Sequence, residues 1–246
     1  MNIKDKEILV IGMARSGIGA AKLAYSQGAK VSVYDAKAFE NLSSSAQEEI
    51  VSMKSKGIRF YLGEDVPVEK FNIVVVSPGV PLDIAIIQNA YKKEKTVIGE
   101  LEFASTYCKA PIVAITGTNG KTTTTTLVGE IIKGANSQTY VVGNIGMAFS
   151  EQVCSIPSNG VAVAEVSSFQ LETINTFHPK ISAILNITPD HLNRHKTMEN
   201  YIDAKCQIYK NQLEDEYIIL NENDTYFEDI KERVKGKVIT FNTEKM

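Results

Sequence analysis

Short apolar runs alternate with longer amphipathic or polar stretches over the first hundred residues. The apolar runs predict strands at 7–12, 30–35, 59–62 and 72–77. The stretches between them predict helices at 17–27, 43–56 and 83–93. Because such alternation is typical of parallel sheets with helices packed on them, this part of the chain predicts a Rossmann-like α/β domain.

The alternation starts again around Thr96–Gly99, where a helix at 100–107 leads into a second series. This series predicts strands at 111–116, 138–143, 161–166, 181–187, 217–221 and 237–241, and helices at 121–133, 197–210 and 225–235. We therefore place a boundary near residue 97, with a first domain over 1–97 and a P-loop-type, parallel-sheet domain over 98–246. Because the series stops soon after a strand, we expect the second domain to be incomplete.

The composition is that of an ordinary globular protein, with 246 residues of which 43% are hydrophobic and 22% charged. A net charge of −3 gives no general attraction for nucleic acid, so phosphate groups need local sites. No apolar run approaches the roughly 20 residues that span a bilayer, and charges interrupt the N-terminus where a signal peptide needs an apolar core. Three widely spaced cysteines fit reduced thiols. We expect a cytoplasmic monomer without membrane contact.

The segment ITGTNGKTT (115–123) joins a predicted strand to a predicted helix. Its glycines let backbone N–H groups converge on an anion, while Lys121 supplies a charge and Thr122 a hydroxyl for Mg²⁺. The general P-loop has a glycine where this chain has Ile115, so the loop is a shortened variant. The segment predicts binding of a nucleoside triphosphate. The alternatives are a turn without function, or the loop of a P-loop kinase or simple ATPase.

The segment GMARSG (12–17) follows the first strand and resembles a dinucleotide-binding fingerprint with Ala14 in place of the middle glycine. Asp35 lies at the end of the second strand, near the position of a ribose partner. A nucleotide sugar diphosphate bound near Arg15 and Ser16 is favoured. An NAD-dependent oxidoreductase or a purely structural turn are alternatives. A second turn, SPGVP (77–81), also follows a buried strand, where open α/β sheets bind ligands.

Polar groups follow two strands of the second domain. Glu165 ends one of them, a position from which a carboxylate reaches a Mg²⁺ held by the P-loop. Ser167 either binds ligand or caps a helix. Asp190 and His191 follow the next strand, and His191 is able to bind a cation. We expect the P-loop, Glu165 and His191 to share one magnesium-binding cleft.

For three further residues, the expectation follows from where residues of their type usually lie in proteins. His178 precedes a proline and is expected to be an ordinary loop residue, and His195 an exposed polar one. Lys205 shares a helix face with Tyr201, four residues earlier, and its spacing alone predicts a solvated surface charge.

Together these motifs resemble the Mur ligase family, the ATP-dependent enzymes that add amino acids to the peptidoglycan precursor. ITGTNGKTT, GNIG (143–146), EVSSFQLE (165–172) and NITPDHLNRH (186–195) occur in family order and at family spacing, so the resemblance covers essentially the whole chain. The segment 12–35, with SPGVP and GELEFA (99–104), resembles the branch that adds D-glutamate to UDP-N-acetylmuramoyl-L-alanine. The L-alanine-adding branch, with its more glycine-rich first loop, remains an alternative.

The resemblance implies two cofactors, ATP and a pair of Mg²⁺ ions, and a possible CO₂-derived carbamate on Lys205. Lys121, His191 and Lys205 would act at the reacting groups. The ATP phosphates would be held by Gly117, Thr118, Asn119, Gly120, Lys121, Thr122 and Thr123. The magnesium ions would be held by Thr122, Glu165, His191 and carbamylated Lys205. The UDP substrate would be bound by Arg15, Ser16, Asp35, Ala36, Lys37, Gly79, Asn144, Ser167 and Gln170.

The implied reaction is phosphoryl transfer followed by amide formation. The L-alanyl carboxylate attacks the γ-phosphate of ATP, and the amine of D-glutamate then attacks the acyl phosphate. Family members also carry the rest of the central domain and a C-terminal domain that binds the amino acid. We expect both parts to be absent here, so that this chain alone has little activity. A catalytically inactive remnant that binds nucleotide sugar and ATP is the alternative.

Overall fold

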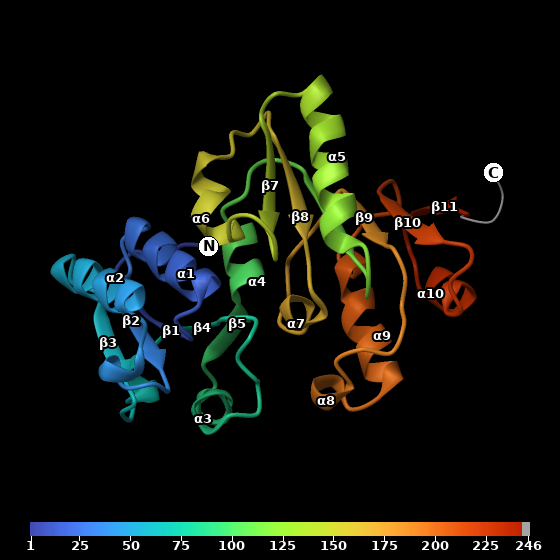
Figure 1. Ribbon diagram of the computed structural model, residues 1–246. Helices are drawn as coiled ribbons and strands as arrows, with labels where there is room; N and C mark the ends of the chain where they lie inside the picture. The colour runs from blue at the N-terminus through green and yellow to red at the C-terminus, as the bar shows by residue number, and fades with distance from the viewer. Residues whose placement is uncertain (243–246) are drawn as a thin grey trace.

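A five-stranded parallel sheet organises the first part of the computed structural model, which describes residues 1–242 (Figure 1). Its strands, in the order β3-β2-β1-β4-β5, are β1 (Glu7–Ile11), β2 (Lys30–Asp35), β3 (Arg59–Leu62), β4 (Ile73–Val76) and β5 (Thr96–Gly99). Its helices are α1 (Arg15–Ser26), α2 (Ser44–Ser55) and α3 (Ala85–Lys92), with 3₁₀ turns η1 (Phe39–Asn41) and η2 (Val68–Lys70). This order matches the first five strands of the Rossmann order 3-2-1-4-5-6.

Alternate residues of the central strand β1 point to opposite faces of this sheet. Ile8 and Val10 pack in the cluster that contains the buried residues of α1 and α2. Leu9 and Ile11 pack instead with Ile87 of α3. Because both faces are covered, the strand reads as a continuous apolar run.

A six-stranded parallel sheet forms the second unit, in the order β11-β10-β9-β6-β8-β7. Its strands are β6 (Ile112–Thr116), β7 (Thr139–Gly143), β8 (Val161–Glu165), β9 (Ile181–Ile184), β10 (Tyr217–Asn221) and β11 (Lys237–Phe241). Three of its helices are α5 (Lys121–Ala135), α9 (Met198–Cys206) and α10 (Phe227–Glu232). The others are α4 (Glu100–Ser105), α6 (Phe149–Gln152), α7 (Ser168–Leu171), α8 (Leu192–His195), η3 (Val153–Ser155) and η4 (Gln207–Tyr209).

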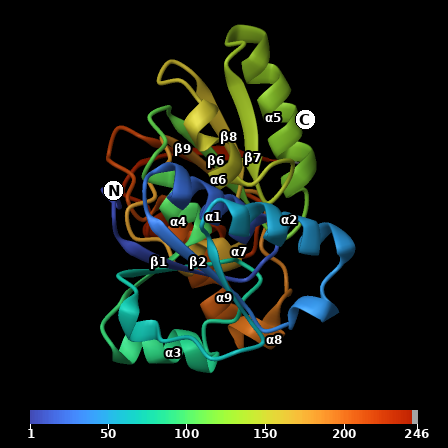
Figure 2. The same ribbon diagram turned by 90° about the vertical axis from the view of Figure 1, so that its left-hand side faces the viewer.

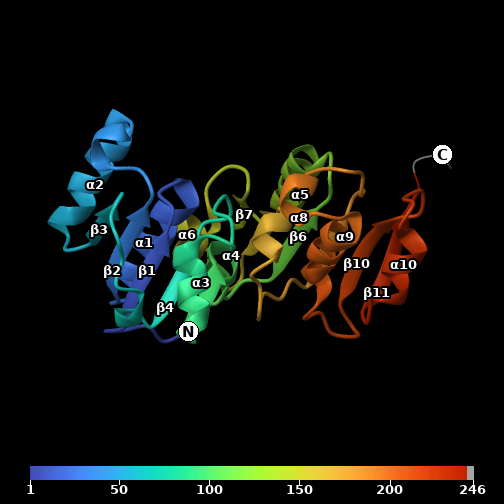
Figure 3. The same ribbon diagram turned by 90° about the horizontal axis from the view of Figure 1, so that it is seen from below.

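Helices α1, α4 and α6 join the two sheets, which stand side by side (Figure 3). Figure 2, seen from the side of the first sheet, shows α1 beside α6. The backbone N–H of Ser150 in α6 donates to the buried carboxyl of Glu100 at 2.8 Å. Glu102 accepts from the N–H groups of Asn175, Thr176 and Phe177 at 2.8–3.0 Å, so α4 is anchored in the second unit.

The structure confirms the two parallel-sheet α/β units, with differences at the boundaries. Residue 97, the predicted boundary, lies within β5, which pairs with β4 and so belongs to the first sheet. The helix predicted over 197–210 ends at Cys206 and continues as η4, and the strand predicted over 181–187 ends at Ile184. Residues 243–246 of the predicted second domain lie outside the described residues. Over 1–242, no helix is both long and apolar enough to cross a membrane.

Candidate functional site

The glycine-rich loop between β6 and α5 lies at the carboxyl edge of the second sheet. Gly120 directly precedes α5 with φ of +80°, a conformation that favours glycine. The backbone N–H groups of Thr118 and Asn119 donate to the carbonyl and side-chain oxygens of Asn186, at 2.8 Å each. Because Asn186 opens the segment NITPDHLNRH, two of the sequence motifs are in direct contact at this edge. Thr123 is exposed in the first turn of α5.

Two lysines meet at one carbonyl of this loop. The Nζ of Lys121 donates to the carbonyl oxygens of Gly117 and Thr118, at 3.0 and 2.8 Å. The Nζ of Lys205, which comes from α9, donates to the same Gly117 oxygen at 2.7 Å. The ammonium of Lys121 is therefore folded back onto its own loop, where it occupies the space above the backbone.

Lys205 is buried, contrary to the solvated position expected from its spacing. Only 1% of the residue is exposed, and its Nζ lies 4.6 Å from the centre of the Tyr201 ring. Burial, together with the charge of Lys121, lowers the pKa of Lys205 to about 7. The base-rate expectation was wrong because the loop after β6 covers this face of α9.

Glu165 connects the P-loop helix to the GNIG segment. Its two oxygens accept from the hydroxyl of Thr122 at 2.8 Å and from the side-chain amide of Asn144 at 2.7 Å. The carboxylate is buried, with 1% exposure, and both of its partners are neutral. A hydroxyl and a carboxylate side by side are hard oxygen ligands of the kind Mg²⁺ prefers.

These groups do not form an all-protein metal cage. Among residues 1–242, no group of three or more His, Cys, Asp or Glu side chains is placed to hold a metal ion. Mg²⁺ commonly binds through one or two carboxylates together with waters and substrate phosphates. The pair Thr122–Glu165 therefore fits a magnesium ion that arrives with a nucleotide.

His191 lies at the same edge but touches none of the other predicted metal ligands directly. It has φ of +53°, and its side chain is 48% exposed. Its ring packs 4.9 Å from that of Phe169, and its Nε2 is 3.4 Å from the Oδ2 of Asp190. Tyr201 contacts both His191 and the P-loop. Its ring is 6.5 Å from that of His191, and its hydroxyl is 3.1 Å from the Thr118 hydroxyl.

Ser167 and Gln170 form a capping box at the start of α7. The Ser167 hydroxyl accepts from the N–H of Gln170 at 3.3 Å. The Gln170 side-chain oxygen accepts from the Ser167 N–H at 2.8 Å. Both side chains are thus engaged in local structure, as in the capping alternative left open by the sequence.

His195 is buried, with 5% exposure, and the expectation of an exposed residue was wrong. Its Nε2 lies 2.9 Å from the hydroxyl of Ser168 and its Nδ1 3.3 Å from Glu172. Burial lowers the pKa of His195, despite the opposing effect of Glu172. His178 also has a partner, because its Nε2 lies 2.6 Å from the buried carboxylate of Glu216.

In the first unit, Asp35 braces the loop after β1. Its carboxylate accepts from the backbone N–H groups of Met13 and Lys37, at 3.0 Å each. The guanidinium of Arg15 donates across to the carbonyl of Gly146 in the second unit. Ser16 is half-buried in the first turn of α1, whereas Ala36 and Lys37 are exposed.

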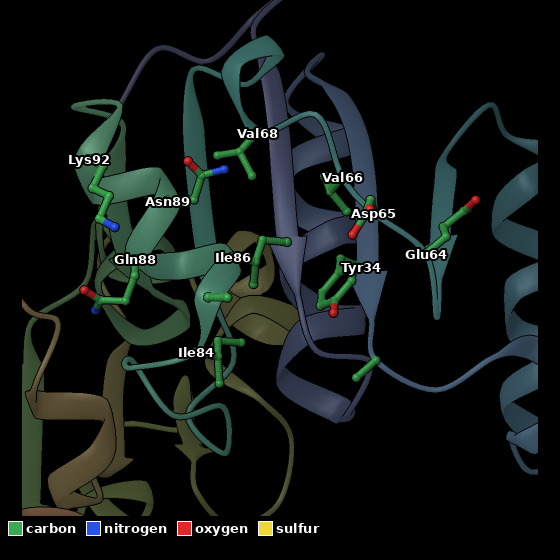
Figure 4. Close-up of a pocket in the computed structure, with 12 residues that line it drawn as sticks. Tyr34, Glu64, Asp65, Val66, Val68, Ile84, Ile86, Gln88, Asn89 and Lys92 are labelled. Carbon is green, nitrogen blue, oxygen red and sulfur yellow. The ribbon is translucent and has the colours of Figure 1, made fainter.

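Two clefts border these residues. A groove of about 630 Å³ lies on the first sheet between α3 and the segment after β3, with Tyr34 on its floor (Figure 4). Ala36 also lines this groove. A cleft of about 580 Å³ lies between the units, where Gly79 of the first faces His191 and Arg194 of the second. The structure thus places Gly79 beside the second sheet's loops and Ala36 beside the groove on the first sheet.

Two family models match the chain. The model described as Mur ligase MurD-like, N-terminal domain matches residues 6–99, and that described as Mur ligase middle domain matches residues 115–246. The chain belongs to the Mur ligase family. The first match ends with β5 at Gly99, and the second begins within β6 and includes the other strands of the second sheet. The family resemblance of the sequence motifs is confirmed.

Curated relatives resemble the chain along nearly its whole length. It is 47% identical over 244 residues to the UDP-N-acetylmuramoylalanine–D-glutamate ligase of Thermoanaerobacter sp. (strain X514). It is 45% identical over 243 residues to the ligase of the same name from Lachnoclostridium phytofermentans. These alignments cover 98% and 99% of this chain but 53% of each relative. The chain spans about half the length of the curated relatives it matches.

Solved structures share the fold. The UDP-N-acetylmuramate:L-alanyl-gamma-D-glutamyl-meso-diaminopimelate ligase from Neisseria meningitides matches with a TM-score of 0.63 at 17% identity, over 96% of this chain and 78% of that one. The UDP-N-acetylmuramate-alanine ligase from Thermotoga maritima matches with a TM-score of 0.55 at 19% identity, over 98% of this chain and 53% of that one. At these identities the likeness shows the fold alone.

Proposed function

We propose that this chain supplies the UDP-substrate and ATP-phosphate sites of a ligase that adds D-glutamate to UDP-N-acetylmuramoyl-L-alanine. The observation that carries the proposal is the meeting of the P-loop, Glu165 and Lys205 at one sheet edge. Lys121 and Lys205 share the Gly117 carbonyl, and Thr122 contacts Glu165. The printed names of the curated relatives supply the substrate class.

The P-loop would bind the nucleotide by exchanging internal contacts for phosphate contacts. Lys121 would leave the carbonyls of Gly117 and Thr118 and place its ammonium against the β- and γ-phosphates. Thr122 and Glu165 would hold a magnesium ion, which when bound neutralises charge on the transferred phosphoryl group. Catalysis would then consist mainly of positioning and electrostatic stabilisation as the L-alanyl carboxylate attacks the γ-phosphate.

Lys205 would act as a carbamate. Its neutral amine would attack the carbon of CO₂, forming an N–C bond and releasing one proton to solvent. The product is an anion, so the like-charge contact between Lys121 and Lys205 at the Gly117 carbonyl would become an attractive one. With His191, the carbamate would hold the second magnesium ion. The lowered pKa of Lys205, about 7, makes an unprotonated amine available near neutrality.

The UDP substrate would lie across the two units. Asp35 fixes the loop that carries Arg15 and Ser16, and Gly79 faces His191 across the inter-unit cleft. We place the uridine diphosphate at the first unit, beside Ala36 and Lys37, and the muramoyl-alanine near Asn144 and the loops of the second sheet. Ser167 and Gln170 would contact it only by giving up their capping box.

Separate calorimetric titrations with ATP·Mg²⁺ and UDP-N-acetylmuramoyl-L-alanine test this assignment. The expected result is binding of both, with UDP-N-acetylmuramic acid, which lacks the alanine, bound more weakly. Binding of NAD(H) instead would favour an oxidoreductase, and release of phosphate from ATP alone would favour a simple ATPase. Preference for the substrate without alanine would indicate the L-alanine-adding branch.

A further inference from the structure

Arg194 connects the two units through a single guanidinium. Its Nη1 donates to the carbonyl of Pro78, in the SPGVP turn of the first unit, at 3.2 Å. Its Nε and Nη2 donate to the carboxylate of Glu172, and the Nη2 contact measures 2.6 Å. Its central carbon lies 4.4 Å from the centre of the Phe169 ring. The side chain is 15% exposed, so little of it faces water.

Each of the three guanidinium nitrogens donates to the protein itself. Glu172 neutralises its charge, one nitrogen is taken by a backbone carbonyl, and one face is covered by Phe169. A guanidinium that recognises a substrate phosphate needs a free pair of N–H groups directed at the anion. Arg194 borders the inter-unit cleft, yet its Nε–Nη2 fork is occupied by the carboxylate of Glu172.

Phe169 and Glu172, which Arg194 contacts, line one wall of that cleft, and Gly79, the neighbour of Pro78, lines the other. Pro78 precedes Gly79 on the wall from the first unit. On the other wall, Phe169 packs against the rings of both His191 and His195, at 4.9 and 5.4 Å. Glu172, the carboxylate partner of Arg194, also lies 3.3 Å from the Nδ1 of His195. One side chain therefore contacts the SPGVP turn directly and the His191 loop through Phe169.

We propose that Arg194 is a positioning residue that fixes the SPGVP turn against the His191 loop, so that both walls of the inter-unit cleft keep one spacing. Lysine replaces it only in part, because an ammonium lacks the planar fork that serves Glu172 and Pro78 together. The proposed contact between the SPGVP turn and the His191 loop does not depend on any ligand. Its consequence for the UDP substrate rests on the proposed function.

The test compares Arg194→Gln and Arg194→Lys with the matched control Arg233→Gln in this 246-residue chain. Arg233 also pairs with two carboxylates, those of Asp203 and Asp229, but lies on the surface away from the cleft. Hydrogen–deuterium exchange is followed in peptides that span the SPGVP turn and, separately, the P-loop. Thermal melting identifies any variant that fails to fold, in which case Arg194→Lys carries the comparison.

Loss of hydrogen bonds to a charged group should speed exchange in the SPGVP turn about tenfold in Arg194→Gln, less in Arg194→Lys, and not in Arg233→Gln. Exchange in the P-loop peptide should stay unchanged in all three. Unchanged exchange in the turn, or equal acceleration in both peptides, would overturn the inference.

A second measurement separates this inference from the proposed function. Arg194→Gln should weaken binding of UDP-N-acetylmuramoyl-L-alanine about tenfold, with ATP·Mg²⁺ affinity unchanged, because only the former ligand needs both walls. If the unmodified chain binds no UDP substrate but exchange in the SPGVP turn is still faster in Arg194→Gln, the proposed function fails and the positioning role stands. If the chain binds the substrate and Arg194→Gln binds it equally well, the positioning role fails alone.

Discussion

Lys121 and Lys205 direct their ammonium groups to the same carbonyl oxygen, that of Gly117, at 3.0 and 2.7 Å. When both amines are protonated they repel each other, and the repulsion is strong because Lys205 is buried. An anion between or beside them removes this cost. The P-loop region is therefore arranged to accept negative charge, either from a phosphate or from modification of Lys205.

The first prediction concerns carbamylation. In ¹³C-bicarbonate at slightly alkaline pH, the chain should show a carbamate carbon signal that disappears in Lys205→Arg. At the lowered pKa of about 7, roughly half of the Lys205 amines are unprotonated near neutrality, while ordinary lysines stay charged. Lys133→Arg, at an exposed position of α5, should leave the signal intact. A signal that persists in Lys205→Arg would rule this residue out.

The second prediction concerns the metal. In Glu165→Gln, the increase in ATP affinity that Mg²⁺ produces should be at least about tenfold smaller, because an amide oxygen is a weaker ligand than a carboxylate. Titration of ATP binding against Mg²⁺ measures the effect. Affinity for metal-free ATP should change little, since Lys121 and the loop remain. Unaltered magnesium dependence in Glu165→Gln would place the ion elsewhere.

The third prediction concerns pH. Burial raises the pKa of Glu216, but hydrogen bonds from Lys180, the Leu213 N–H and His178 outweigh it, so the net shift is downward. A carboxyl with a depressed pKa stabilises the fold above its unfolded value, near 4.5, and loses that contribution as pH falls through the folded value.

Glu216→Gln should therefore lower the free energy of unfolding by about 1–3 kcal/mol at pH 7, with the difference shrinking below pH 4.5. Urea unfolding at several pH values provides the measurement. Glu228→Gln, at a carboxylate that is 76% exposed, should change stability little at any pH. A Glu216→Gln deficit that stays constant into acid would show that charge is not its cause.

The fourth prediction separates backbone strain from packing at the P-loop. A Cβ on Gly120 would meet its nearest neighbour, Leu185 Cδ1, at 3.8 Å, so space is available, but its φ of +80° disfavours L side chains. Gly120→Ala should cost about 1 kcal/mol of unfolding free energy and Gly120→Asn less. Gly134→Ala, in open space near the end of α5, should instead stabilise by about 0.5–1 kcal/mol. Equal effects of the two alanine substitutions would exclude strain at Gly120.

The strands were the part of the fold most open to sequence reasoning. Runs such as IVVV in β4 are buried on both faces of a parallel sheet, so their apolar character is continuous and easily recognised. The four-residue helices α6, α7 and α8 complete barely one turn and show no hydrophobic period. They were missed as helices, although the Ser167 cap of α7 was weighed as an alternative.

In the candidate site, too, some contacts could be predicted from the sequence and others could not. The contact between Thr122 and Glu165 follows from two strand ends at one sheet edge, which motif position already indicated. The buried partners of His195 and Lys205 come from segments 27 and 88 residues away, Ser168 and Gly117. No local pattern carries such information, so base rates predicted exposure for both and failed.

For this chain, the order of amino acids by itself determined two α/β units, the glycine-rich loop between β6 and α5, and the family. It could do so because apolar runs and glycine-rich turns act over short stretches of backbone. Only the tertiary structure decided which charges are buried, that two lysines share one carbonyl, and that Arg194 connects the units. Those outcomes depend on desolvation and on contacts between distant segments, which exist only once the sheets have brought the loops together.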